Sequence, residues 1–171
     1  NMASKGDHMN IKFEKLSENH DVDVMDVFNY YAENEFSSFA AGRMPEKFFS
    51  MMLNSISAYP AYAVYADSLF AGFGFLRPYS PMGVFKKTAS VSYFLHPPFT
   101  GKGIGSAFLD KLIGEAAETG IENIMAEIAS ENQASINFHK KHNFNECGRF
   151  PSIAEKFDKK FDIVWMHRNI K

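Results

Sequence analysis

The feature that most constrains the fold is a run of closely spaced glycines, Gly101, Gly103 and Gly105. The apolar segment 89–95 precedes the run, and the apolar residues of segment 104–117 recur every three to four positions. This order predicts a strand, a glycine-rich turn and a helix. The first turn of such a helix leaves backbone N–H groups unpaired at the positive end of the helix dipole, and glycines let an anion approach them closely. The run therefore predicts a phosphate cradle, although a plain turn joining strand to helix has the same pattern.

Two common phosphate-binding loops do not fit this run. A Walker A loop needs Ser or Thr directly after its Gly-Lys pair, whereas Lys102 is followed by Gly103. A dinucleotide fingerprint starting at Gly101 or Gly103 needs its third glycine at position 106 or 108, and the chain has Ser106 and Phe108 there. The failure of the dinucleotide fingerprint at both possible starts disfavours a nicotinamide-dependent oxidoreductase.

The rest of the chain alternates between strand-like and helix-like patterns, which predicts one α/β domain with a mixed sheet over residues 9–171. Two apolar runs flank Asp67 and Ser68, so segment 62–77 is expected to be an antiparallel hairpin, a further argument against a dinucleotide-binding sheet. Asp21 or Asp23 is expected to cap the first helix and Pro45 to start the second. The predicted elements are a strand at 11–16, helices at 21–33 and 45–56, the hairpin, a strand at 89–95, a helix at 104–117, a strand at 123–129, a helix from 132, and strands around 144 and at 163–166.

Composition bounds the environment and the partners. Eighteen Lys and Arg against twenty Asp and Glu leave a formal net charge of -2, so nucleic-acid binding through a global basic field is not expected. No apolar run approaches the roughly 18 to 20 residues that span a bilayer, and we expect a cytoplasmic protein without a membrane partner. Cys147 is the one cysteine, which fits a reducing compartment, and it is expected to be a small core residue. Residues 1–8 lack any period and are interpreted as an expression remnant.

Several motifs together resemble one enzyme family. They are the segment from Ser92 to Pro98, the glycine run, the segment from Glu131 to His139, and Asn143 with Phe144. These segments resemble the acyl-coenzyme A core of the GNAT superfamily of N-acetyltransferases. The closing segment 154–166 is similar to the phosphinothricin acetyltransferase branch. The resemblance implies a GNAT-like fold, acetyl-CoA as co-substrate, and transfer of an acetyl group to the primary amine of a small molecule, an amino acid or analogue above all.

The resemblance also implies where the coenzyme lies. In the family, the strand matching 89–95 splays from the strand matching 123–129, and its freed backbone pairs with the pantetheine arm. The pyrophosphate then lies on the amides of the glycine run. The coenzyme-binding residues implied in this way are Phe94, Leu95, Gly101, Lys102, Gly103, Ile104, Gly105, Ser106, Asn132 and Ser135. Asn132 can also be a plain helix N-cap.

Three positions bear on coenzyme binding and catalysis: two depart from the family pattern and one matches it. Thr100 replaces the usual Arg or Gln before the glycines, which removes a charged phosphate contact. Ser90 stands where the branch has a carboxylate, so a water held by Ser90, or Glu127 on the next strand, is the candidate for the general base. His139 matches a family Tyr or His and is the candidate donor for the leaving thiolate. His142 follows at i+3, but without a third ligand no metal site is expected.

The acceptor side is expected between the first two helices. Glu33, Glu35 and Phe36 combine carboxylates and a ring, which would suit a primary ammonium on a partly apolar molecule. A homodimer is expected. Ser90 and Thr100 keep open the alternative that the chain is an acyl-CoA-binding module without catalysis.

Overall fold

The computed structural model describes residues 9–171 and confirms the predicted order of elements. The expectation for residues 1–8 lies outside this range. The helices and strands are β1 Ile11–Lys15, α1 Asp21–Asn34, α2 Lys47–Ser55, β2 Ala61–Ala66, β3 Leu69–Pro78, β4 Thr88–Leu95, α3 Ile104–Glu118, β5 Asn123–Ala129, α4 Gln133–Lys141, β6 Asn145–Lys156 and β7 Lys159–Asn169, with short 3-10 turns at 18–20, 83–85 and 97–99. The result is a mixed α/β fold, as expected.

The strands of the described chain form one seven-stranded sheet in the order β1-β2-β3-β4-β5-β7-β6. Every neighbouring pair is antiparallel except β4 and β5. The β2–β3 turn confirms the predicted hairpin, because Asp67 and Ser68 have φ of 49° and 69°, as a type I′ turn requires.

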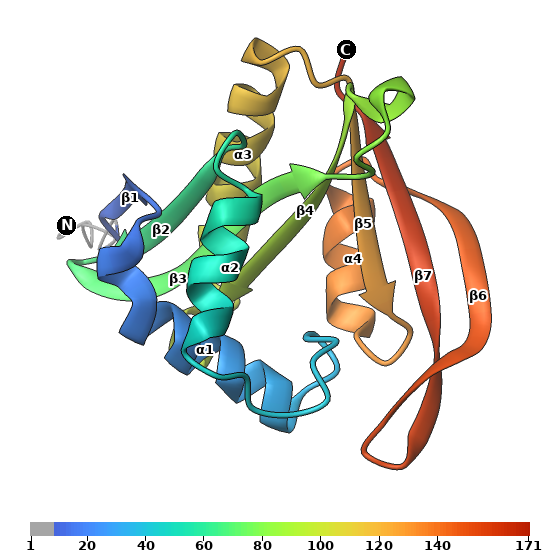
Figure 1. Ribbon diagram of the computed structural model, residues 1–171, viewed down its shortest axis with the longest axis horizontal. Coiled ribbons are helices and arrows are strands. Elements are labelled where there is room, and N and C mark those ends of the chain that lie inside the picture. The colour runs from blue at the N-terminus through green and yellow to red at the C-terminus, as the bar shows by residue number, and fades with distance from the viewer. Residues whose placement is uncertain (1–8) are drawn as a thin grey trace, which may run out of the picture.

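Helices cover both faces of the sheet, with α1 and α2 on one face and α3 and α4 on the other (Figure 1). Alternation along the strands sends side chains into two apolar clusters. One cluster joins α1 and α2 to Phe73 and Phe75 of β3, and the other joins α3 and α4 to Val91 of β4 and Ile124 of β5. The helices therefore hold the sheet from both sides around its centre.

The parallel pair β4–β5 opens after a few residues. Thr88, Ala89 and Ser90 pair with Asn123, Ile124 and Met125, and no later pair follows in the described chain. Figure 1 shows the two strands diverging from that point. The expected splay is confirmed, and it leaves one backbone edge of residues 91–95 without a strand partner.

Three local expectations were wrong. A 3-10 turn precedes α1, so the chain turns helical after Ser17, and neither Asp21 nor Asp23 is the cap. The second helix begins at Lys47, two residues after Pro45. Cys147 is exposed, not a core residue, because β6 is the edge strand of the sheet and has a strand neighbour on one side only.

Candidate active site

The glycine run forms the N-terminal end of α3, as predicted. Gly101 and Gly103 have φ of 72° and 83°, and a Cβ added at either would meet open space. Gly103 is the N-cap, and no described residue accepts a hydrogen bond from the backbone N–H groups of 101–106. Unpaired N–H groups at an open helix N-terminus suit phosphate. The geometry thus fits the predicted cradle.

The members of this run contribute in different ways. The side chain of Ile104 is fully buried, so this residue can offer a ligand only its backbone N–H. Gly105 faces Phe138 of α4 at 3.5 Å from an added Cβ, so its lack of a side chain serves helix packing. Lys102 is exposed, with Nζ 5.9 Å from the Phe99 ring centroid, and Ser106 is half-buried in the first turn of α3.

The splayed edge of β4 and the start of α4 border the same end of the sheet. Phe94 points to the α1 side and packs on Phe28 and Phe73 with ring centroids 5.5 Å apart in each pair. The carbonyl of Leu95 accepts a 2.6 Å hydrogen bond from the Tyr31 hydroxyl. Asn132 caps α4 by accepting from the backbone N–H of Ser135 at 3.1 Å. These residues stay predictions as coenzyme contacts, and the N-cap is confirmed.

His139 lies in a buried hydrogen-bonded pair with Tyr93 of β4. Its Nδ1 lies 2.7 Å from the Ser135 carbonyl and its Nε2 2.6 Å from the Tyr93 hydroxyl. The carbonyl accepts only, so Nδ1 carries the proton and Nε2 accepts from Tyr93. Burial lowers the pKa of His139 to about 4, so the ring is neutral at pH 7. His139 therefore reaches the open strand edge through Tyr93, which the sequence interpretation did not include.

We expect His139→Phe to remove part of the pH dependence of stability. The pKa of His139 falls from 6.5 to about 4 on folding, so the unfolded chain binds more protons in this window and stability is lost as pH falls through it. Between pH 7 and pH 5 the natural chain should lose about 2 kcal/mol through this residue. Urea unfolding at both pH values, with His142→Phe as control, measures the difference. An unchanged pH dependence in His139→Phe would contradict a buried neutral ring.

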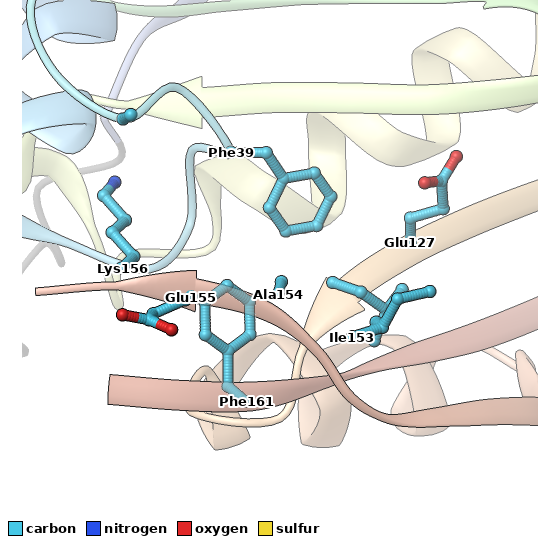
Figure 2. A pocket seen from close by; sticks show the side chains of 9 residues that line it. Phe39, Glu127, Ile153, Ala154, Glu155, Lys156 and Phe161 are labelled. Carbon is cyan, nitrogen blue, oxygen red and sulfur yellow. The ribbon is translucent and has the colours of Figure 1, made fainter. Parts of the chain in front are cut away.

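A cavity of about 250 Å³ lies on the other side of the sheet. Its walls come from the α1–α2 loop, the β6–β7 hairpin and β5. The lining residues are Phe39, Ala41, Glu127, Ile153, Ala154, Glu155, Lys156, Phe161 and Ile163. Figure 2 shows Phe39 above Phe161, with Lys156 at one end and Glu127 at the other, while the carboxylate of Glu155 points away. The cavity is thus mainly apolar, with a carboxylate at one end.

The β6–β7 register shapes this wall. Phe150 pairs with Ile163 and Ala154 with Phe161, so β6 carries extra residues between these pairs. The bulge is held by Asp162, whose carboxylate accepts from the backbone N–H of Ser152 at 2.8 Å. The bulge brings Ile153 to the cavity, as bulges often re-aim a side chain near a site.

Glu127 forms an ion pair with Arg77 that crosses above Ser90. The Arg77 guanidinium donates to Glu127 Oε1 at 3.1 Å. Arg77 pairs with Ser90 across β3–β4, and Ser90 pairs with Met125 across β4–β5, so these three side chains point to one face of the sheet. Glu127 is two residues after Met125 on the same strand and therefore points to that face as well. The Ser90 hydroxyl is buried and has no hydrogen-bond partner in the described chain. A small residue at 90 leaves room for the ion pair above it.

The carboxylates predicted for the acceptor lie elsewhere. Glu33 is exposed and pairs with Arg43 at 3.3 Å, and Glu35 is exposed at the C-terminal cap of α1. Neither lines the cavity. Phe36 does not line the cavity but packs on Phe161, which does, with ring centroids 5.2 Å apart. Glu33 and Glu35 stay predictions as acceptor contacts: both are exposed and lie outside this cavity, whose wall carries Phe39, three residues after Phe36.

Residues 9–171 contain neither a metal-binding cluster nor a membrane-spanning helix. No three His, Cys, Asp or Glu side chains converge in a way that could hold a metal ion. Across the same residues, no helix combines the length and the apolar character needed to cross a membrane.

The comparisons with known proteins agree with this geometry. Residues 24–144 match the model of the acetyltransferase (GNAT) family. The chain is 29% identical over 112 residues to the L-amino acid N-acyltransferase MnaT of Escherichia coli K12, covering 66% of this chain and 65% of that protein. It is 30% identical over 108 residues to the L-methionine sulfoximine/L-methionine sulfone acetyltransferase of Salmonella typhimurium, covering 63% of each.

The matched stretches span less than two thirds of the length of either relative. Among solved structures, a GNAT phosphinothricin acetyltransferase from Sinorhizobium meliloti in complex with AcCoA superposes with a TM-score of 0.89 at 18% identity, covering 93% of this chain and 88% of that one. This likeness concerns the fold. With the family model matching most of the chain, the protein belongs to the acetyltransferase (GNAT) family.

Proposed function

We propose that this protein transfers an acetyl group from acetyl-CoA to the primary amine of a small molecule. The observation that carries the proposal is the opening between β4 and β5 beside the glycine cradle, with the Glu127 cavity on the opposite face. The names of two relatives, an L-amino acid N-acyltransferase and an L-methionine sulfoximine/L-methionine sulfone acetyltransferase, support the same class of reaction.

The chain's own groups fit acetyl-CoA on one side of this opening. The backbone N–H groups of 101–106 would hold the pyrophosphate. The edge of 91–95 that has no strand partner, apart from the Leu95 carbonyl bound by Tyr31, would pair with the amides of the pantetheine arm. Bound there, acetyl-CoA supplies an activated acyl thioester. The chain adds orientation, because the opening lies between two strands that are fixed by helices on both faces.

Glu127 is the proposed acceptor of the amine proton. Only Oε1 pairs with Arg77, so Oε2 can receive a hydrogen bond from a substrate ammonium and then its proton. Ser90 keeps its proposed role as the holder of a water beside this pair, since its hydroxyl is buried without a partner. On the coenzyme side we assign protonation of the leaving thiolate to the Tyr93 hydroxyl, which would regain its proton from water. Neutral His139, whose N–H is bound to the Ser135 carbonyl, positions this hydroxyl through Nε2.

The cavity suggests the class of acceptor. Its apolar walls suit an apolar side chain, and Glu127 in its lining forms an ion pair at 3.1 Å with Arg77, which lies outside the lining. An α-amino acid presents its ammonium and carboxylate with the same closeness. We therefore propose an apolar amino acid or its analogue, such as leucine or a methionine sulfone.

Thiol release from acetyl-CoA tests the function across a panel of leucine, methionine sulfone, lysine, glutamate, polyamines and peptides. We expect turnover with the apolar amino acids, and at least about tenfold lower kcat/KM for lysine and glutamate, whose charged ends would be buried against apolar walls. Amines that carry an isobutyl group but no carboxylate show whether the substrate's carboxylate contributes to turnover in addition to its ammonium. Acetyl-CoA binding without thiol release for any amine would favour a binding module without catalysis.

We also propose a cytoplasmic homodimer. An exposed free thiol at Cys147 is compatible with a reducing compartment. Met82, Val84 and Phe150 are exposed apolar side chains that a second copy would cover. Sedimentation at micromolar concentration checks the stoichiometry, and a monomer there would contradict it.

A further inference from the structure

Lys156 joins the two walls of the acceptor cavity. It lies at the end of β6, and its residue exposure is 7%. Its ammonium donates to three backbone carbonyls, those of Tyr31 at 3.2 Å, Glu35 at 2.5 Å and Ser38 at 2.8 Å. The three N–H bonds of an ammonium are thereby all used. A lysine so placed is an anchor, since lysine is almost never fully buried without partners.

The three carbonyls all belong to the end of α1 and the segment after it. Tyr31 is in the last turn, Glu35 is the C-terminal cap, and Ser38 lies in the connection to α2. Carbonyls at a helix C-terminus lack partners within the helix and carry partial negative charge, so a cation there is favourable. The contacts span 118 to 125 residues of sequence, which makes Lys156 a long-range tether.

The tethered segment forms one wall of the cavity. Residues 35–41, here termed the acceptor loop, place Phe39 directly after the anchored Ser38, opposite Phe161 (Figure 2). Two contacts between this region and the coenzyme side do not involve Lys156 and would remain without its ammonium. Asn132 donates to the Ser37 hydroxyl at 3.0 Å, and the Tyr31 hydroxyl donates to the Leu95 carbonyl of the splayed strand. Releasing the ammonium would free the loop at its centre.

We propose that Lys156 is a positioning residue that holds the acceptor loop against the β6–β7 hairpin and so forms the acceptor site. The inference rests on the proposed function and deepens it. Lys156 touches neither reacting group. It acts through Phe39, whose position follows from the three anchored carbonyls. Its loss should therefore weaken acceptor binding and leave the glycine cradle, on the other face of the sheet, unaffected.

The test compares Lys156→Met with Lys160→Met, which removes an exposed lysine from the neighbouring strand. Met keeps the length and apolar stem and removes the ammonium. For Lys156→Met we expect the acceptor KM to rise about tenfold while the acetyl-CoA KM stays within about twofold. Hydrogen exchange should show faster exchange confined to residues 31–41. Lys160→Met should match the natural chain in all three measurements.

Each outcome decides the inference. An unchanged acceptor KM, an equal rise in both Michaelis constants, or unchanged exchange in the loop would overturn it. Loss of the whole fold in both Lys156→Met and Lys156→Gln would overturn it as well, because the proposal confines the effect to the loop. Absence of acetyl transfer by the natural chain would instead contradict the proposed function, while the exchange measurement would still report on the tether.

Discussion

Gly103→Asp is expected to weaken acetyl-CoA binding at least about 100-fold, because its carboxylate would stand where the pyrophosphate is held and two charge-assisted hydrogen bonds of about 1.5 kcal/mol each would be lost. The fold should persist. An added Cβ at Gly103 meets open space, and a negative charge at the N-terminal end of α3 favours the helix dipole. Titration calorimetry with acetyl-CoA measures the effect.

Two matched variants isolate the charge in this experiment. Gly103→Asn has the shape of aspartate and makes the same demand for positive φ, but it carries no negative charge. It should therefore lose far less affinity for acetyl-CoA than Gly103→Asp. Gly114→Asp adds the same charge within α3, also in open space, but away from the cradle. Gly105→Asp is less informative, because its side chain would meet Phe138. Retained affinity in a folded Gly103→Asp protein would contradict the assignment of the loop.

Local pattern was enough to predict most of the fold. Alternation and helical spacing gave the right order of all strands and helices in the described chain, because each element buries one face of its own. The glycine run predicted the start of α3 for the same local reason, since Gly101 and Gly103 need positive φ. The splay of β4 from β5 came from the family resemblance and not from periodicity.

The site depended on contacts between residues far apart in sequence. Arg77 and Glu127 are 50 residues apart, and Tyr93 and His139 are 46 apart. Periodicity tells which face a residue occupies, but strand order and register decide what lies opposite. Arg77 does carry a local hint, as a lone charge ending the apolar strand β3. Glu33 carries a local hint as well: it follows buried Ala32 and lies off the buried face of α1, which indicates an exposed side chain.

Glu127→Gln is expected to lower kcat by about 100-fold or more at pH 7, within the range that a general base contributes. Glutamine keeps the shape and can still accept from Arg77, but it cannot take the proton of the substrate ammonium. Acetyl-CoA affinity should be unchanged, because the glycine cradle lies on the other side of the sheet. Steady-state kinetics with leucine and calorimetry with acetyl-CoA measure the two quantities.

Glu33→Gln is the matched control for this substitution. Glu33 also pairs with an arginine, at 3.3 Å against 3.1 Å for Glu127, but it lies outside the cavity. Its variant should keep the natural rate. An equal loss in both variants would assign the effect to surface charge and remove Glu127 from the mechanism.

The dependence of the rate on pH gives a second, independent test of the role of Glu127. Without a base, Glu127→Gln can use only amine that lost its proton before binding, and that fraction rises about tenfold per pH unit below the pKa of the amine. The deficit of the variant should therefore shrink steadily toward pH 9. A constant ratio of the two rates across pH would show that Glu127 acts by binding the ammonium and not by taking its proton.

Position 90 offers a rescue that depends on the geometry of the ion pair. Ser90 lies beneath the Arg77–Glu127 pair on the same face, and Arg77 is its partner across β3–β4. In Glu127→Gln, the further substitution Ser90→Glu would place a carboxylate on that face within reach of Arg77, so part of the lost rate should return. In the natural background the same substitution adds a second carboxylate beside Glu127, and the like charges should lower the rate. Rescue in one background and loss in the other would locate the base on this face of the sheet, whichever strand carries it.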